Sequence, residues 1–160
     1  MSSNDLLKDL ANEETPLKYS KLLQLSGLSS EELADFTPEW VSVAGARKHE
    51  ILAKLVELSE NNLEFDFSGV FRASLDDAEE DVREKATLGL WESDDRAIIR
   101  PLIGLLNEDP SAKVKAAAAL TLGKFAAMAQ NRKLLPRDAE RIQQALIAVI
   151  SLEAEDLEVR

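Results

Sequence analysis

The sequence predicts an all-α protein, with residues 1–160 forming a single domain of stacked antiparallel helical hairpins, and three observations lead to that fold class. Alanine and leucine dominate a chain of 160 residues in which only 5% are aromatic, and this composition favours helices over sheets. Apolar residues recur at helical spacing in segments separated by short polar turns. One such unit, an acidic turn followed by a helix that opens on valine, occurs twice, with Val82 and Val114 at equivalent places.

The first third of the chain, residues 1–60, is expected to form irregular helices that cap the repeats or represent a degenerate repeat. A helix opens at Ser29 or Ser30, since serine is a good N-cap and Glu31 and Glu32 follow. Thr37-Pro38 is a second helix start, because proline lacks the amide that stays unpaired at the first helical position. A strongly amphipathic helix ending near Glu60 follows.

From residue 65 onward, amphipathic segments alternate regularly with the polar turns DDAEED, NEDPSAK and EAEDLE. The expected helices cover residues 65–75, 82–92, 94–106, 114–129 and 137–152. A further helix is expected to begin at Val159-Arg160, the last two residues of the sequence. Because a helical stack normally closes with a polar capping repeat, we expect a fragment of a longer chain or an end buried in an oligomer.

Two copies of one motif carry a family resemblance: an acidic turn, a valine followed by a basic residue, an alanine four residues after the valine, and then leucine, as in DDAEEDVREKATLGLW and EDPSAKVKAAAALTLGKF. The motif resembles the HEAT-repeat family, most clearly over residues 65–160. The resemblance implies a right-handed α-α superhelix of stacked antiparallel helical hairpins, whose second helices line a concave surface. It also implies a ladder of polar contacts between layers, formed by Asp77, Arg83, Asp109 and Lys115. Because lysine cannot form the bidentate fork that arginine makes with a carboxylate, the rung at Lys115 is expected to be weaker.

The charge of the chain restricts its partners. A net charge of −11 disfavours nucleic acid and anionic membranes, since binding to either needs Lys and Arg to neutralise phosphate. Residues 65–96 carry ten acids against four bases, whereas residues 97–135 carry two acids against six bases. Either neighbouring layers attract each other, or the basic layer is a docking surface for an acidic partner. The chain lacks cysteine, a secretory signal and the run of about 20 apolar residues that crosses a bilayer, so we expect it to be soluble and cytoplasmic.

No set of residues predicts catalysis, a cofactor or a metal site. His49 is the only histidine, and the second histidine that a zinc-protease motif requires four residues later is missing. The acidic turns lack the central glycine and terminal glutamate of a calcium-binding loop. Trp91 stands where the HEAT family usually has glycine, and it either fills a gap in the core or is an exposed anchor for a partner.

The leading functional hypothesis is a non-catalytic scaffold or adaptor that binds another protein. Its candidate partner-binding residues, on or near the concave surface that the resemblance implies, are Arg83, Trp91, Lys113, Lys115 and Lys124. One alternative is an enzyme or accessory subunit, because some HEAT-like proteins resemble bilin lyases and others are DNA glycosylases, although no residue can be named as catalytic. Another alternative is a structural component that self-associates through its open C-terminal end.

Overall fold

The computed structural model describes residues 3–93, 95–130, 137–138 and 140–148. The contacts between Cα atoms group the chain into two compact units, Met1–Ser93 and Asp94–Arg160, and each unit is described by itself. Every regular element among the described residues is an α-helix or a 3-10 helix, so the prediction of an all-α helical-repeat fold is confirmed. A single domain and a right-handed superhelix stay predictions.

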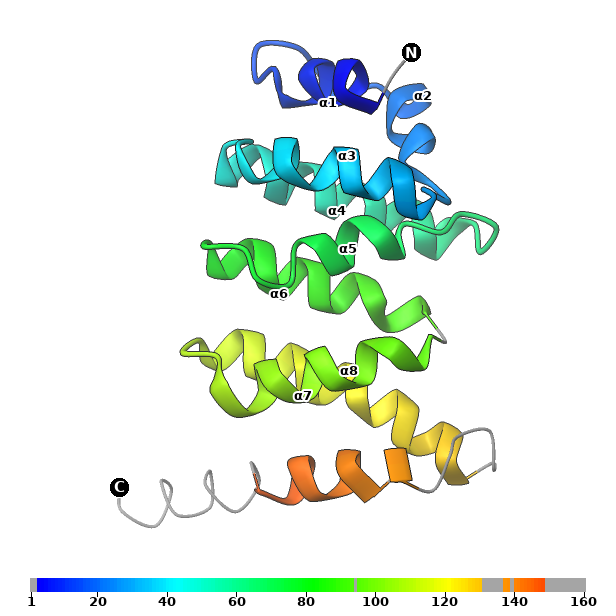
Figure 1. The fold of residues 1–160 in the computed structure, drawn as a ribbon, viewed down its shortest axis with the longest axis vertical. Helices are drawn as coiled ribbons and strands as arrows, with labels where there is room; N and C mark the ends of the chain where they lie inside the picture. The colour runs from blue at the N-terminus through cyan, green and yellow to red at the C-terminus, as the bar shows by residue number, and fades with distance from the viewer. Residues whose placement is uncertain (1–2, 94, 131–136, 139, 149–160) are drawn as a thin grey trace. The chain divides into compact units, whose positions relative to one another are not determined.

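The described part of the first unit consists of helices that double back on one another, drawn from blue to green in Figure 1. Its α-helices are α1 (Ser3–Ala11), α2 (Tyr19–Leu22), α3 (Ser30–Val41), α4 (Gly45–Asn61), α5 (Ser68–Ala73) and α6 (Glu80–Gly89), and its 3-10 turns are Leu23–Leu25 and Leu90–Glu92. α5 packs on α6 within one hairpin, while α1 packs on α3 and α4 packs on α6 between layers. Contacts therefore run both within and between successive layers of this unit.

Helix α3 runs unbroken through a proline. Its N-cap is Ser29, whose hydroxyl accepts from the Glu32 N–H at 3.1 Å, while the Glu32 carboxylate accepts from the Ser29 N–H at 3.1 Å. The helix continues past Pro38 to Val41, so the prediction of a separate helix start at Thr37-Pro38 is wrong. Pro38 lies on the exposed side, where the carbonyl that it leaves without a donor can bind water, and the helix tolerates it there.

Aromatic residues join the layers of the first unit. Trp40 of α3 is fully buried, stacks on Phe36 with ring centroids 5.2 Å apart, and donates from Nε1 to Ser74 Oγ at 2.8 Å. Ser74 is the C-cap of α5, so this hydrogen bond ties one hairpin to the next. Gly89 of α6 lies against the buried ring of Phe71, since a Cβ at this position would be 2.5 Å from the ring. The close approach of α5 and α6 therefore depends on the absence of a side chain at Gly89.

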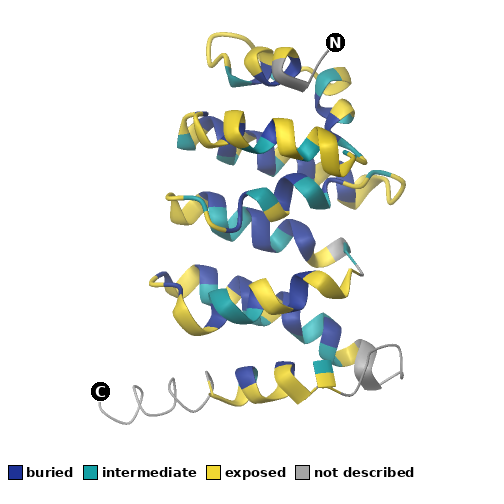
Figure 2. Cartoon of the chain, in the orientation of Figure 1, coloured by how far each residue is buried: buried dark blue, intermediate teal, exposed yellow. Residues whose placement is uncertain are grey.

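The second unit is built on the hairpin of α7 (Ile99–Glu108) and α8 (Ala112–Gln130), after a 3-10 turn at Arg96–Ile98. α7 and α8 pack against each other, and residues 137–138 and 140–148 are also helical, with Ile142 fully buried. Buried residues follow the inner side of each helix, and exposed residues follow the outer side (Figure 2). The helix start predicted at Val159-Arg160 lies outside the described residues.

Candidate interaction surfaces

A buried ion pair links the two hairpins at the end of the first unit. Lys48 Nζ in α4 donates to Asp77 Oδ2 at 2.6 Å, and each side chain is only 6% exposed. Arg83 Nη1 in α6 donates to the main-chain carbonyls of Asp77 and Ala78, at 2.8 and 3.2 Å. The acidic turn therefore binds Lys48 of the preceding hairpin and Arg83 of α6, the helix that follows the turn.

The lysine of this pair occupies a position that recurs in the later repeats. Lys48, Arg83 and Lys115 are each the fourth residue of their helix, α4, α6 and α8. The N–H of each donates to the carbonyl of the residue that precedes its helix, at 2.9, 3.1 and 3.1 Å. Sequence analysis missed Lys48 because no acidic turn precedes α4, although its distance from the helix start was a usable signal.

The two acidic turns of the predicted ladder share one local structure. Asp77 Oδ1 accepts from the Glu79 N–H at 3.0 Å, and Asp109 Oδ1 accepts from the Ser111 N–H at 2.9 Å. Asp109 is buried and Lys115 is half-buried. Both aspartates thus fix the turn that precedes the second helix of a hairpin, which is a structural role.

The three candidate lysines lie on two sides of α8. Lys113 is seven residues before Leu120 and eleven before Lys124, so these three side chains share one face of the helix. Leu120 is 57% exposed, and Lys124 Nζ lies 5.4 Å from the centroid of the Phe125 ring. Lys115 is nine residues before Lys124, which is two and a half turns, so it lies on the opposite side. Of these lysines, Lys113 and Lys124 form a common surface and Lys115 does not join it.

The other two candidates belong to the first unit. Trp91 lies in the 3-10 turn that follows α6, and 41% of it is exposed. Trp91 therefore does not fill a gap in the core, and the interpretation as an exposed aromatic residue fits the structure. Arg83 is half-buried and engaged with the turn before α6.

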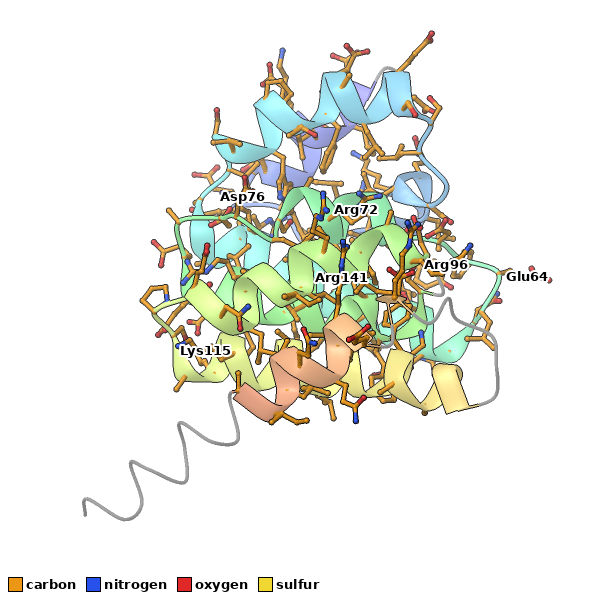
Figure 3. The ribbon with its side chains drawn as sticks, turned by 60° about the horizontal axis from the view of Figure 1, so that its bottom comes forward. Glu64, Arg72, Asp76, Arg96, Lys115 and Arg141 are labelled. Carbon is orange, nitrogen blue, oxygen red and sulfur yellow. The ribbon has the colours of Figure 1, made fainter. Side chains whose placement is uncertain are left out.

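The described part of the second unit contains a groove of about 610 Å³ between α7, with its preceding turn, and the helix at 140–148. Three arginines line it, together with one acid and several apolar and amide side chains. The lining residues are Arg96, Ala97, Ile99, Arg100, Ile103, Asn107, Asp138, Arg141, Gln144, Ala145 and Ala148. Figure 3 labels Arg96 and Arg141, which line the groove. It also labels Lys115, which lies at the opposite end of the α7–α8 hairpin from Arg96.

The arginines of the groove stand out in a chain with 30 acids and 19 bases. Arg96, Arg100 and Arg141 are all exposed, and within the described residues none of their side chains makes an ion pair or a hydrogen bond. Sequence analysis missed them because Arg96 falls in the acidic stretch and Arg141 falls beyond the basic one. The spacing of Arg96 and Arg100, four residues apart on one helical face, was the available signal.

Metal-binding and membrane-spanning features do not occur in the part of the chain that the structure describes. No group of three His, Asp or Glu side chains there lies close enough to hold a metal ion, and no described helix is long and apolar enough to cross a membrane. His49 is half-buried on α4. Two candidate sites remain in this part of the chain. One is the outer face of α8, which carries Lys113, Leu120 and Lys124, and the other is the arginine-lined groove.

The described architecture is that of a helical-repeat protein, with successive hairpins and a recurring place for a basic residue in the second helix of each. Comparison with known families agrees, because the family model for HEAT repeats matches residues 70–151, slightly more than half of the chain. The chain belongs to the HEAT-repeat family, as its motif predicted. No curated protein and no solved structure matches it.

Proposed function

We propose that the chain is a non-catalytic scaffold that binds another protein through the outer face of α8. HEAT repeats generally mediate contacts between proteins. The observation that carries the proposal is that the middle of α8 is apolar around its whole circumference. Between Lys115 and Lys124 its only polar residue is Thr121, and that side chain is fully buried.

An exposed face of this composition is unusual for a surface helix. Helices on the surface of a globular protein normally turn polar residues outward, and a helix that is apolar all round is normally covered on every side. Here Ala116 and Leu120 are exposed in the middle of the face, and Lys113 and Lys124 stand at its ends. An apolar centre with charged residues at its edge is the usual arrangement of an interface, and the lysines favour an acidic rim on the partner.

The test is affinity capture from an extract of the native cell, comparing the protein with three variants. Leu120→Glu places a charge in the centre of the face, and the double variant Lys113→Glu with Lys124→Glu reverses its edges. Both are expected to weaken capture of the same partner by about tenfold or more. Lys18→Glu, an exposed change in the first unit, is the matched control and should capture the partner unchanged.

Two results would contradict the proposal. One is equal recovery of every bound protein by all the variants, which would remove α8 from the interface. The other is a mass in light scattering that rises with concentration for the unchanged protein and not for Leu120→Glu. That result would show that the face binds a second copy, and the alternative of a self-associating structural component would replace the adaptor.

A further inference from the structure

The groove between α7 and the helix at 140–148 has two kinds of surface. Ile99, Ile103 and Ala145 are among its apolar lining residues, and Ile103 is the most exposed of the three. Arg96, Arg100 and Arg141 are its basic lining residues. The volume of about 610 Å³ lies within the range of about 300–1,000 Å³ that is typical of ligand pockets. The groove is therefore large enough for a few residues of a bound segment.

The charge of the groove is the feature that the fold does not explain. Arg96, Arg100 and Arg141 carry three positive charges against the single negative charge of Asp138, and no ion pair neutralises any of them within the described residues. Gathering like charges costs folding free energy, because each repels the others. The cost is offset when an anionic ligand occupies the groove, and arginine is the residue whose planar fork fits a carboxylate at two points.

We propose that this groove is a binding site for a short acidic peptide segment of a partner protein. Arg96, Arg100 and Arg141 hold its carboxylates, and an apolar side chain of the same segment packs on the exposed part of Ile103. The site is distinct from the outer face of α8 and involves none of its residues, so it does not depend on the scaffold proposal.

A peptide suits the groove better than a nucleic acid does. The apolar lining at Ile103 has no counterpart in a phosphate backbone, and the amides of Asn107 and Gln144 can pair with the main chain of a peptide. The net charge of −11 also repels a long polyanion, whereas a short acidic segment experiences mainly the local arginines. Asp138 opposes both ligands, and its effect on affinity can be measured separately.

The experiment uses fluorescence anisotropy with the whole chain and a short labelled peptide rich in Glu and Leu. A peptide with Gln in place of each Glu controls for apolar binding. Binding of the acidic peptide is expected, and Arg100→Gln and Arg141→Gln should each weaken it on the order of tenfold. Arg100→Lys keeps the charge but loses the fork, so it should lose less than Arg100→Gln. Asp138→Asn removes the opposing charge and should tighten binding several-fold.

Controls separate this site from the face of α8. The double variant Lys113→Glu with Lys124→Glu should bind the acidic peptide as the unchanged protein does, and so should Lys18→Glu. Circular dichroism checks that each variant remains folded. Failure of the acidic peptide to bind, or equal binding by the arginine variants, overturns the proposal. Tighter binding of a single-stranded oligonucleotide, lost in the same arginine variants, would assign the groove to nucleic acid instead.

Discussion

The ammonium group of Lys48 lies 2.6 Å from the carboxylate of Asp77, and the two buried side chains come from adjacent hairpins. The resemblance to HEAT repeats predicts a ladder of polar contacts between layers that includes Asp77 and Arg83, but Arg83 donates to the carbonyls of the turn before its own helix. The structure adds an ion pair to the previous layer, so the same aspartate caps its own turn through Oδ1 and binds its neighbour through Oδ2. One residue thus couples local turn geometry to packing between repeats.

Replacement of the lysine in this pair should destabilise the protein strongly. Lys48→Met leaves the Asp77 carboxylate buried without its partner, and the loss of one member of a buried pair costs about 3–5 kcal/mol. Urea unfolding followed by circular dichroism measures the change in the free energy of unfolding. Adding Asp77→Asn should recover part of the loss, because Asn keeps the oxygen that caps the turn and removes the unpaired charge.

The control for this prediction is an exposed ion pair on the same helix. Lys54 and Glu57 lie 3.6 Å apart and are 55% and 62% exposed, so Lys54→Met should change stability by less than about 1 kcal/mol. If Lys48→Met proved no more costly than Lys54→Met, the pair with Asp77 would not contribute to the stability of the layers.

Two glycines provide a matched test of helix packing. Gly89→Ala brings a Cβ to 2.5 Å from the buried ring of Phe71, and this overpacking should cost about 1–3 kcal/mol despite the better helix propensity of alanine. A Cβ added at Gly104 of α7 would meet no atom within 4 Å, so Gly104→Ala should stabilise by up to about 1 kcal/mol. Thermal unfolding of both variants gives opposite shifts in Tm; shifts of the same sign would contradict the contact at Gly89.

The hairpin repeats could be predicted because their signal is local. The spacing from Val82 to Val114, the apolar periodicity and the acidic turns all lie within single helices or turns, and propensity and packing agree there. The helix start at Thr37-Pro38 was predicted wrongly for a physical reason. On the exposed side of a helix, the carbonyl that a proline leaves without a donor can bind water, so the proline costs little there. The capping box at Ser29 stabilises the helix by more than this cost.

The surfaces were harder to predict because they combine residues that are distant in sequence. Lys48 and Asp77 are 29 positions apart, and the groove combines Arg96 and Arg100 with Arg141 from a later helix. Counting charges in consecutive windows placed these three arginines in three different stretches of the chain. Helical periodicity along α8 separates Lys115 from Lys113 and Lys124, although the sequence analysis grouped all three, but it could not show that the residues between Lys113 and Lys124 are exposed.

The two tryptophans should report separately on the core and the surface. In the Trp91→Phe variant the remaining emission comes from Trp40, which is fully buried, so it should be blue-shifted and resist quenching by acrylamide. In Trp40→Phe the emission comes from Trp91, which is 41% exposed, and acrylamide should quench it readily. Equal quenching in the two variants would show that Trp91 is as well covered as Trp40, contrary to the structure.

Trp40→Phe should also lower stability. The change removes the hydrogen bond from Nε1 to Ser74 Oγ in a fully buried setting, and it leaves unfilled volume where the indole stacks on Phe36. The hydrogen bond alone accounts for about 1 kcal/mol, and the lost packing adds to it. Chemical unfolding measures the total, and Trp91→Phe, a change at an exposed position, should cost less than about 0.5 kcal/mol.

The arginines of the chain should divide into those that stabilise the fold and those that do not. Arg47 is 4% exposed and donates to the main-chain carbonyls of Leu10, Asn12 and Thr15 at 2.7, 3.0 and 2.7 Å. Arg47→Gln should leave several of these carbonyls unpaired, and each hydrogen bond from a charged donor contributes about 1.5–3 kcal/mol. A large fall in Tm is expected, because this side chain fastens the loop after α1 to α4.

Arg100→Gln should behave in the opposite way. Its side chain makes no hydrogen bond or ion pair within the described residues and lines the groove together with Arg96 and Arg141, so its removal lowers the repulsion among like charges and breaks no polar contact with a described residue. The expected result is an unchanged or slightly higher Tm, together with weaker binding of the acidic peptide. If Arg100 contributes to binding and not to the stability of the fold, its role is to bind the ligand. If Arg100→Gln lowered Tm as Arg47→Gln does, the groove arginines would instead be part of the structural network.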